Sequence, residues 1–148
     1  MIGEHNMEKV GVELEYLGDV DFKVKFDHGA MDDLVIAASR VPKDQTGGVA
    51  RKLLAASVTY CMAGWLFTLL QKTRVDVNAL KAKAEVTMSK DESGREFVDK
   101  IDMQIQVQIS DEDVNAFERC KSIVDRGCLI SRSLIRGVKV THSISRIK

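Results

Sequence analysis

Residues 53–70 read LLAASVTYCMAGWLFTLL, a stretch of eighteen residues that carries no charge and holds Cys61 near its middle. Basic residues flank it on both sides: Arg51, Lys52, Lys72 and Arg74. The length reaches the lower bound for a membrane span, but polar residues interrupt the run and the flanks give no orientation bias. A helix that is apolar on all sides can also lie at the centre of a soluble fold. Because the surrounding sequence is typical of strands, we expect a central buried helix and no membrane span.

The bulk composition indicates one globular domain over residues 1–148, since 45% of the residues are hydrophobic and 30% are charged. The net charge is zero. The chain therefore lacks the excess of Lys and Arg that is typical of nucleic-acid-binding proteins, so we expect no nucleic-acid partner. The first ten residues, MIGEHNMEKV, lack the apolar segment of a signal peptide. The three cysteines do not suggest a disulfide framework, and we expect a cytoplasmic protein.

Alternating apolar and polar residues predict strands on both sides of the central helix. Residues 10–16 and 22–26 alternate in this way, and residues 34–38 form a short apolar run, so the three segments predict a three-stranded meander. A loop over 39–48, with the Gly47-Gly48 pair, leads into the helix. After the helix, residues 80–88 and 101–109 predict a long hairpin.

The C-terminal third predicts two helices and a last strand. The first helix begins after Ser110 and ends near Gly127, the second covers 128–135, and the strand covers 138–144. The predicted order is βββ-α-ββ-α-α-β, with antiparallel sheets wrapped around one long helix. This order is typical of the α+β class.

Most familiar catalytic and metal-binding motifs are absent from the sequence. His5, His28 and His142 are scattered, and none has a cysteine or acid at metal-ligand spacing, so we expect no metal site. His142 falls on the apolar side of the last predicted strand, where a core or edge histidine is expected.

The three cysteines are the remaining candidates for reactive residues. Cys61 and Cys120 each fall on an apolar helical position, where a cysteine usually serves as a small buried hydrophobe. Cys128 follows Gly127 at the start of a helix, where free backbone N–H groups and the helix dipole favour a thiolate. On chemistry alone, Cys128 is the best candidate for a reactive thiol.

Two segments resemble the signature regions of the OsmC/Ohr family of thiol-dependent hydroperoxide reductases. They are KLLAASVTYC at residues 52–61 and RGCLISRSL at residues 126–134. The order of the elements is also similar, from about Val10 to the end of the chain. The resemblance implies an OsmC-like fold, an intertwined homodimer and no bound cofactor.

The resemblance also implies roles for individual residues. Cys61 takes the place of the peroxidatic cysteine and Cys128 that of the resolving one, while Arg40 lies near the position of the arginine that stabilises the thiolate. Two positions depart from the family pattern. Arg51 replaces the glutamate that orients this arginine, and Leu129 replaces the proline after the resolving cysteine.

Two functional hypotheses follow. In the first, the protein is an enzyme: a Cys61 thiolate, its pKa lowered by Arg40 or Arg51, attacks an organic hydroperoxide and becomes a sulfenic acid. Cys128 then closes a disulfide, and an external dithiol, from a lipoyl protein or a thioredoxin-like protein, restores both thiols. The apolar wall around Met62, Trp65 and Leu66 favours alkyl or lipid hydroperoxides.

In the second hypothesis the fold is a binding module with inert cysteines. Thr46, Gly47 and Gly48 precede the helix, and Arg51 follows, so backbone N–H groups and positive charge could receive an anion. The ligand would be an acyl thioester or a nucleotide-containing cofactor.

Overall fold

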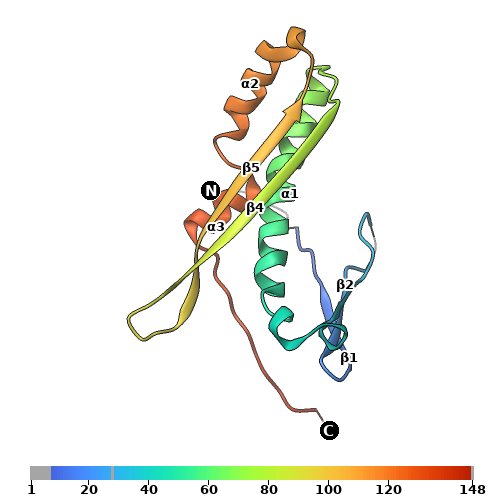
Figure 1. Ribbon diagram of the computed structural model, residues 1–148, viewed down its shortest axis with the longest axis vertical. Helices are drawn as coiled ribbons and strands as arrows, with labels where there is room; N and C mark the ends of the chain where they lie inside the picture. Colours follow the sequence, from blue (N-terminus) through green and yellow to red (C-terminus); the bar gives the residue numbers. More distant parts are fainter. Residues whose placement is uncertain (1–7, 28, 148) are drawn as a thin grey trace, which may run out of the picture. The chain divides into compact units, whose positions relative to one another are not determined.

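The computed structural model describes residues 8–27 and 29–147 and divides into two compact units, Met1–Val49 and Ala50–Lys148 (Figure 1). The expectation of a single domain over 1–148 stays a prediction. His5 and His28 lie outside the described residues, so the interpretation of these two histidines also stays a prediction.

The N-terminal unit is the predicted antiparallel meander. Its strands β1 (Glu13–Gly18), β2 (Asp21–Lys25) and β3 (Leu34–Ala37) pair in the order of the sequence. Two short 3-10 helices follow, η1 (Ala38–Arg40) and η2 (Lys43–Gln45). β1 begins three residues later than its alternation indicated, and its apolar side chains remain exposed within this unit.

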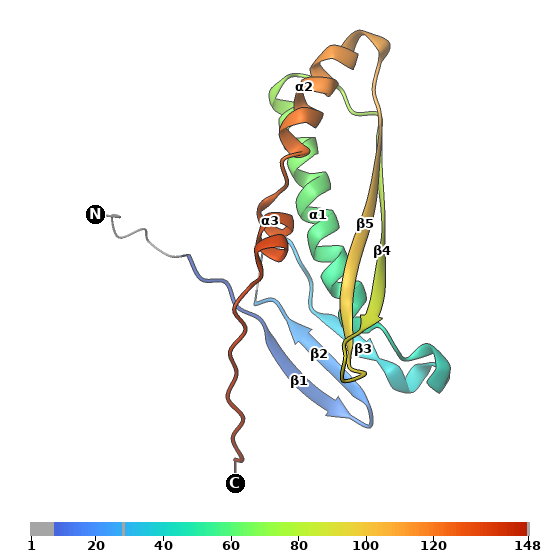
Figure 2. The ribbon, with the colours of Figure 1, turned by 90° about the vertical axis from the view of Figure 1, so that its left-hand side faces the viewer.

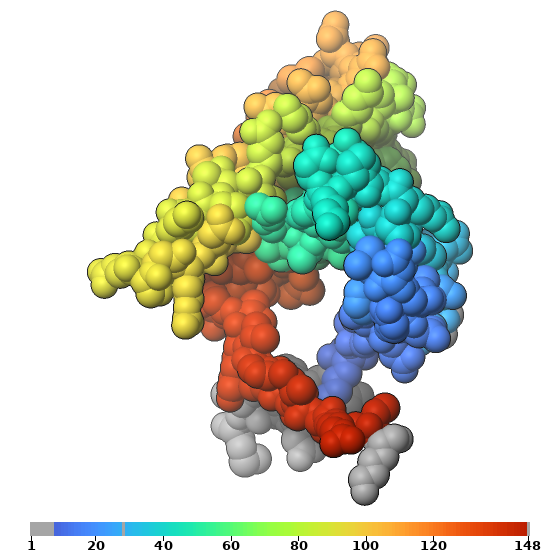
Figure 3. Space-filling view, turned by 60° about the horizontal axis from the view of Figure 1, so that its bottom comes forward, coloured from blue at the N-terminus to red at the C-terminus, as the bar shows by residue number. Residues whose placement is uncertain are grey.

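The C-terminal unit is built on α1 (Val49–Lys72), which lies along the hairpin of β4 (Ala79–Lys90) and β5 (Glu96–Gln108) (Figure 2). The antiparallel hairpin register runs from Ala79–Gln108 to Lys90–Glu96, with one irregularity after Thr87. Alternate side chains of β5 are half-buried, as the two-residue period predicts. Figure 3 shows the distal part of the hairpin projecting from the rest of this unit.

Two further helices, α2 (Val114–Val124) and α3 (Leu129–Arg136), lie beside α1, and a 3-10 turn, η3 (Asp111–Asp113), precedes α2. The hydrophobic core of the unit lies between α1, α2 and β5. Its fully or nearly buried members are Leu66, Leu70, Val75, Cys120 and Val124. Packing of these apolar side chains is what holds α2 against α1.

α1 buries only one face within this chain. The buried positions recur at helical spacing, from Ala55 to Leu70, whereas Tyr60 on another face is 80% exposed. Helix Lys43–Lys72, in which η2 and α1 are counted together, is long and apolar enough to cross a membrane, and 28% of its most apolar stretch is buried. The architecture is the predicted α+β fold with a long central helix, but one chain covers this helix only in part.

The prediction of a final strand over 138–144 is wrong for the single chain. Residues 138–147 leave α3 without strand pairing, and Val140 is 83% exposed. A strand requires a neighbour for its N–H and C=O groups, and the described part of the chain offers none here. His142 is therefore exposed on this tail and is neither a core nor an edge histidine.

Candidate functional site

Cys61 lies inside α1, twelve residues after the helix begins at Val49. The backbone N–H groups of its own helical turn are committed to the bonding pattern of the helix. The residue is half-buried. Its helix therefore positions the thiol rigidly but offers it no free donor from the surrounding turn.

Cys128 lies at the N-cap of α3 with an extended backbone (φ −87°, ψ 176°). Its Sγ accepts a hydrogen bond from the backbone N–H of Ser131 at 3.4 Å, and its own N–H donates to Ser131 Oγ at 2.9 Å. This reciprocal pair is a capping box in which a cysteine replaces the usual hydroxyl or carboxylate. The cap fixes the Cys128 side chain at the end of the helix dipole that stabilises negative charge.

Gly127 makes this cap possible. Its backbone has a φ of +94°, a conformation that residues with a side chain rarely adopt. A Cβ at this position would lie 2.9 Å from Arg132 Cγ and 3.0 Å from Ser131 Oγ. Both the turn and the close packing against α3 therefore require a glycine immediately before the cysteine.

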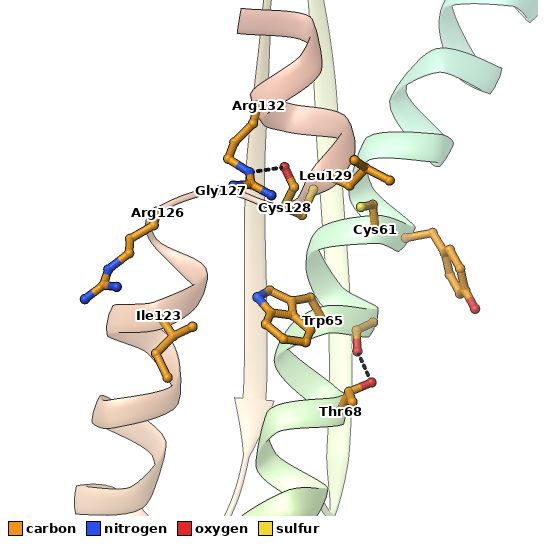
Figure 4. A pocket seen from close by; sticks show the side chains of 11 residues that line it. Cys61, Trp65, Thr68, Ile123, Arg126, Gly127, Cys128, Leu129 and Arg132 are labelled. Atoms are coloured by element: carbon orange, nitrogen blue, oxygen red, sulfur yellow. Dashed lines mark hydrogen bonds between the residues drawn. The ribbon is translucent and has the colours of Figure 1, made fainter. Parts of the chain in front are cut away.

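Cys61 and Cys128 line one pocket of about 620 Å³ within the C-terminal unit. Figure 4 shows their side chains pointing toward one another from α1 and from the start of α3, and both thiols are free. The other lining residues come from α1, α2, the α2–α3 connection and α3. They are Tyr60, Gly64, Trp65, Thr68, Ile123, Arg126, Gly127, Leu129 and Arg132.

The pKa values of the two thiols are shifted in opposite directions. Burial raises the pKa of Cys61, and its hydrogen bond to Cys128 raises it further, against weaker lowering by the N–H groups of Ile130 and Leu129. Burial also acts to raise the pKa of Cys128. There, hydrogen bonds from Cys61, from the Ser131 N–H and hydroxyl, and from the Ile130 N–H outweigh burial, so the pKa of Cys128 is lowered. The pair holds one negative charge more readily than two.

The C-terminal unit contains three of the predicted site residues, Cys61, Cys128 and Arg51. Cys61 and Cys128 meet, whereas Arg51 is exposed near the start of α1, about 15 Å along the axis from Cys61. Arg40, at the end of η1, belongs to the other unit. The pKa shift of Cys61 is opposite to the lowering expected from an arginine beside it.

The region predicted to receive an anion has a local structure of its own. Gly47 and Gly48 lie at the end of the N-terminal unit, and Gly48 has a φ of +82°. The Thr46 hydroxyl donates to the Lys43 carbonyl at 2.8 Å and so closes η2. This part of the chain therefore forms a tight turn before α1, within the loop that the sequence predicted over 39–48.

The apolar wall is only partly as predicted. Trp65 lines the pocket, but Leu66 is a member of the hydrophobic core and Met62 packs against that core. Within residues 8–27 and 29–147, no group of three or more His, Cys, Asp or Glu side chains could hold a metal ion. The chemistry of the pocket therefore rests on its two thiols.

Sequence reasoning missed three residues of the site: Arg126, Ser131 and Arg132. Arg126 and Arg132 line the pocket, and Arg132 Nε donates to the Cys128 carbonyl at 3.4 Å. All three lie in the segment RGCLISRSL that carried the resemblance. Ser131 could have been found, because the spacing of a capping box places it three residues after a cysteine at the N-cap.

Comparisons with known proteins agree with this architecture. The family model described as OsmC-like protein matches residues 43–143. Among solved structures, an OsmC-like protein of unknown function from Vibrio cholerae has a TM-score of 0.65 at 16% identity and covers 85% of this chain and 93% of its own. An OsmC-like protein from Mycoplasma pneumoniae has a TM-score of 0.64 at 15% identity, with coverages of 88% and 89%.

An OsmC-like hydroperoxide resistance protein from Jannaschia sp. CCS1 has a TM-score of 0.52 at 13% identity and covers 91% of each chain. No curated protein matches the chain significantly. At these identities the solved structures share the fold, and the family model extends over more than half of the sequence. The chain belongs to the OsmC-like protein family.

Proposed function

We propose that this protein reduces organic hydroperoxides with the Cys61–Cys128 thiol pair. The observation that supports this most strongly is the convergence of the two thiols on one pocket from α1 and from the cap of α3. Two thiols that face one another can pass through a sulfenic acid to a disulfide without a bound cofactor. A structural neighbour from the same family is named as a hydroperoxide resistance protein.

The reaction requires both thiols. One thiolate attacks the outer peroxide oxygen, the O–O bond breaks, and the products are a sulfenic acid and an alkoxide that takes a proton to become an alcohol. The second thiol then attacks the sulfenic sulfur and water is released as the disulfide forms. The family resemblance gives the first step to Cys61 and the second to Cys128. An external dithiol, from a lipoyl or thioredoxin-like protein, reduces the disulfide.

The lining of the pocket supports an organic peroxide as the substrate. Beside the thiols lie the apolar side chains of Trp65, Ile123 and Leu129. Burial of alkyl groups against such a wall contributes about 0.8 kcal/mol per methylene. Alkyl and lipid hydroperoxides gain this contribution and hydrogen peroxide does not.

We further propose that the protein acts in the cytoplasm as a homodimer. α1 exposes apolar side chains that one chain leaves uncovered, among them Trp65 and Phe67. A second copy would bury them. Light scattering at tens of micromolar should give a mass of about twice 16.5 kDa, and a mass of one chain would rule the dimer out.

The test of the activity is consumption of cumene hydroperoxide with dihydrolipoamide as the reductant. The wild-type protein should turn over repeatedly, and C61S and C128S should each lose turnover. The matched control is C120S, because Cys120 is buried in the core away from the pocket. Absence of peroxide consumption by the wild-type protein would refute the enzyme and favour the alternative, a binding module with inert cysteines.

A further inference from the structure

Two residues of α3, Ser131 and Arg132, hold all three polar atoms of Cys128. The Cys128 N–H donates to Ser131 Oγ at 2.9 Å, and its Sγ accepts the Ser131 N–H at 3.4 Å. Its carbonyl accepts the backbone N–H of Arg132 at 3.0 Å and the Ser131 hydroxyl at 3.3 Å. The position and direction of the Cys128 sulfur are therefore set by the residues that follow it by three and four positions.

The side chain of Arg132 adds a further bond to the same carbonyl. Its Nε donates to the Cys128 oxygen at 3.4 Å, and Figure 4 shows the guanidinium folded back from α3 toward the cap. The stem of this side chain occupies the space that a side chain at Gly127 would need, since a Cβ there would lie 2.9 Å from Arg132 Cγ. Among the described residues, no carboxylate forms an ion pair with Arg132. Its guanidinium is therefore free to bind at the cap.

The sulfur on the other side of the pocket is also held in place. Cys61 lies within the continuous helix α1, and its side chain points toward Cys128 (Figure 4). Because a disulfide forms only in a narrow range of Cα separations and side-chain torsions, the direction of each sulfur decides whether the bond can close. α1 fixes one of the two directions, and the cap of α3 fixes the other.

We propose that Ser131 and Arg132 are positioning residues for the second step of the reaction. They hold the Cys128 sulfur in line with the sulfenic acid on Cys61 and take no part in the attack on the hydroperoxide. This inference rests on the proposed function, in which Cys61 reacts first and Cys128 resolves. It follows from the hydrogen bonds that fix Cys128 within the pocket that holds both thiols.

The step that the two residues assist is disulfide closure. Cys128 gives up its thiol proton, its sulfur attacks the sulfur of the Cys61 sulfenic acid, the S–S bond forms and the S–O bond breaks. The oxygen leaves as hydroxide and takes a proton, so one water is released. The Cys128 sulfur is oxidised and the sulfenic sulfur is reduced, so this step consumes no further oxidant.

The speed of closure matters because closure competes with a second oxidation. A sulfenic acid that is not resolved reacts with another hydroperoxide and becomes a sulfinic acid, which a dithiol does not restore. Groups held in the right geometry react far faster than free groups, and a displacement of about 1 Å can cost about 100-fold in rate. A Cys128 sulfur that is fixed in place therefore protects Cys61 during turnover.

The test separates the two steps in S131A and R132A. Reduced protein is mixed with one equivalent of cumene hydroperoxide and quenched at intervals. The released alcohol reports the first step, and the disulfide, measured by mass spectrometry after alkylation, reports the second. Both variants should release alcohol at the rate of the wild-type protein and close the disulfide about 10- to 100-fold more slowly. With excess hydroperoxide, both should accumulate sulfinic acid at Cys61.

Two substitutions on the same helix are the matched controls. S133A removes a hydroxyl that donates to the Leu129 carbonyl at 2.7 Å, and R136A removes a guanidinium one turn beyond Arg132. Neither residue is among those that line the pocket, so both variants should keep both rates. S131T retains the hydroxyl and should close the disulfide faster than S131A. Equal slowing of the two steps in S131A and R132A, or unchanged closure, would overturn the inference.

A further measurement needs no variant. In the reduced wild-type protein, the Cys128 amide should exchange with solvent more slowly than in an unstructured peptide of the same sequence, because Ser131 Oγ accepts its hydrogen bond. Exchange at the peptide rate would overturn the positioning role even if the variants were to misfold. If the wild-type protein releases no alcohol, the proposed function fails, whereas turnover with both steps unaltered in the variants refutes this inference alone.

Discussion

Cys120 and Cys128 lie eight residues apart in the sequence and are almost equally buried, at 2% and 4% exposure. Cys120 lies inside α2 among apolar side chains of the core, and its Sγ is 3.6 Å from the Thr73 hydroxyl. Cys128 lies at the N-cap of α3 and lines the pocket. Burial is thus the same in the two places, and the backbone differs. The helix-end position of Cys128 gives its sulfur a backbone N–H donor, whereas Cys120 inside α2 packs as a small apolar side chain.

The largest difference between Cys128 and Cys120 should appear in turnover when each sulfur is removed in turn. C128S should lower turnover of an organic hydroperoxide by about 10³-fold or more, because the disulfide can no longer form. C120S should keep turnover close to that of the wild-type protein. Steady-state assays with a dithiol reductant measure both, and a comparable loss in C120S would place Cys120 in the reaction.

A second prediction concerns Gly127. Gly127→Ala should destabilise the protein by about 1–3 kcal/mol through backbone strain and lower turnover about 10- to 100-fold by displacing the cap. The control is Gly94→Ala. Gly94 also has a positive φ, +80°, but a Cβ added there would meet no atom of a non-neighbouring residue within 4 Å. Both variants should lose stability in urea, but only Gly127→Ala should lose activity, and equal loss of activity would contradict the role of the cap.

The third prediction addresses the core cysteine. Cys120→Ala should reduce the free energy of unfolding by about 1–2 kcal/mol, since it removes a buried atom and leaves a small cavity between α1 and α2. Urea denaturation of the reduced protein measures the change. No loss of stability would show that this part of the core relaxes fully around the deletion.

The smallest expected effect is a shift in a pH profile. The pKa of Cys128 is lowered, so its thiolate persists as the pH falls until the pH passes below that lowered pKa, and the rate of thiol loss should fall there. Ser131→Ala removes a hydroxyl that lowers this pKa and should move the midpoint to higher pH. Ser133→Ala is the control, because the Ser133 hydroxyl donates to the Leu129 carbonyl at 2.7 Å. An identical shift in both variants would contradict the assignment.

Much of the fold was predictable because local patterns specify it. The two-residue period indicated β2 and the β4–β5 hairpin, a short apolar run indicated β3, and the uncharged run at 53–70 indicated most of α1. The final strand failed because alternation reports only that a segment suits a sheet and cannot supply the neighbour with which it pairs. For residues 138–147 no such neighbour lies in the described part of the chain.

The two cysteines of the site were predictable from the sequence, whereas the arginines that line the pocket were not. Cys61 and Cys128 came from the family resemblance, and the helix-start position of Cys128 was visible in the sequence. Arg126 and Arg132 were missed because their proximity to the thiols depends on the turn at Gly127 and on the packing of α3, which no periodicity reports. The direction in which the pKa of Cys61 is shifted depends on the same tertiary contacts.

The wide separation of Cys61 and Cys128 along the chain links the redox state to folding. Their disulfide would close a loop of 67 residues, and the loss of chain entropy in the unfolded state would favour the folded protein by about 4 kcal/mol. Every turnover would then alternate between a more stable oxidised form and a less stable reduced form. Until a dithiol reduces it, the protein would remain in the oxidised form, which resists unfolding more strongly. The midpoint of thermal denaturation would therefore fall when dithiol is supplied.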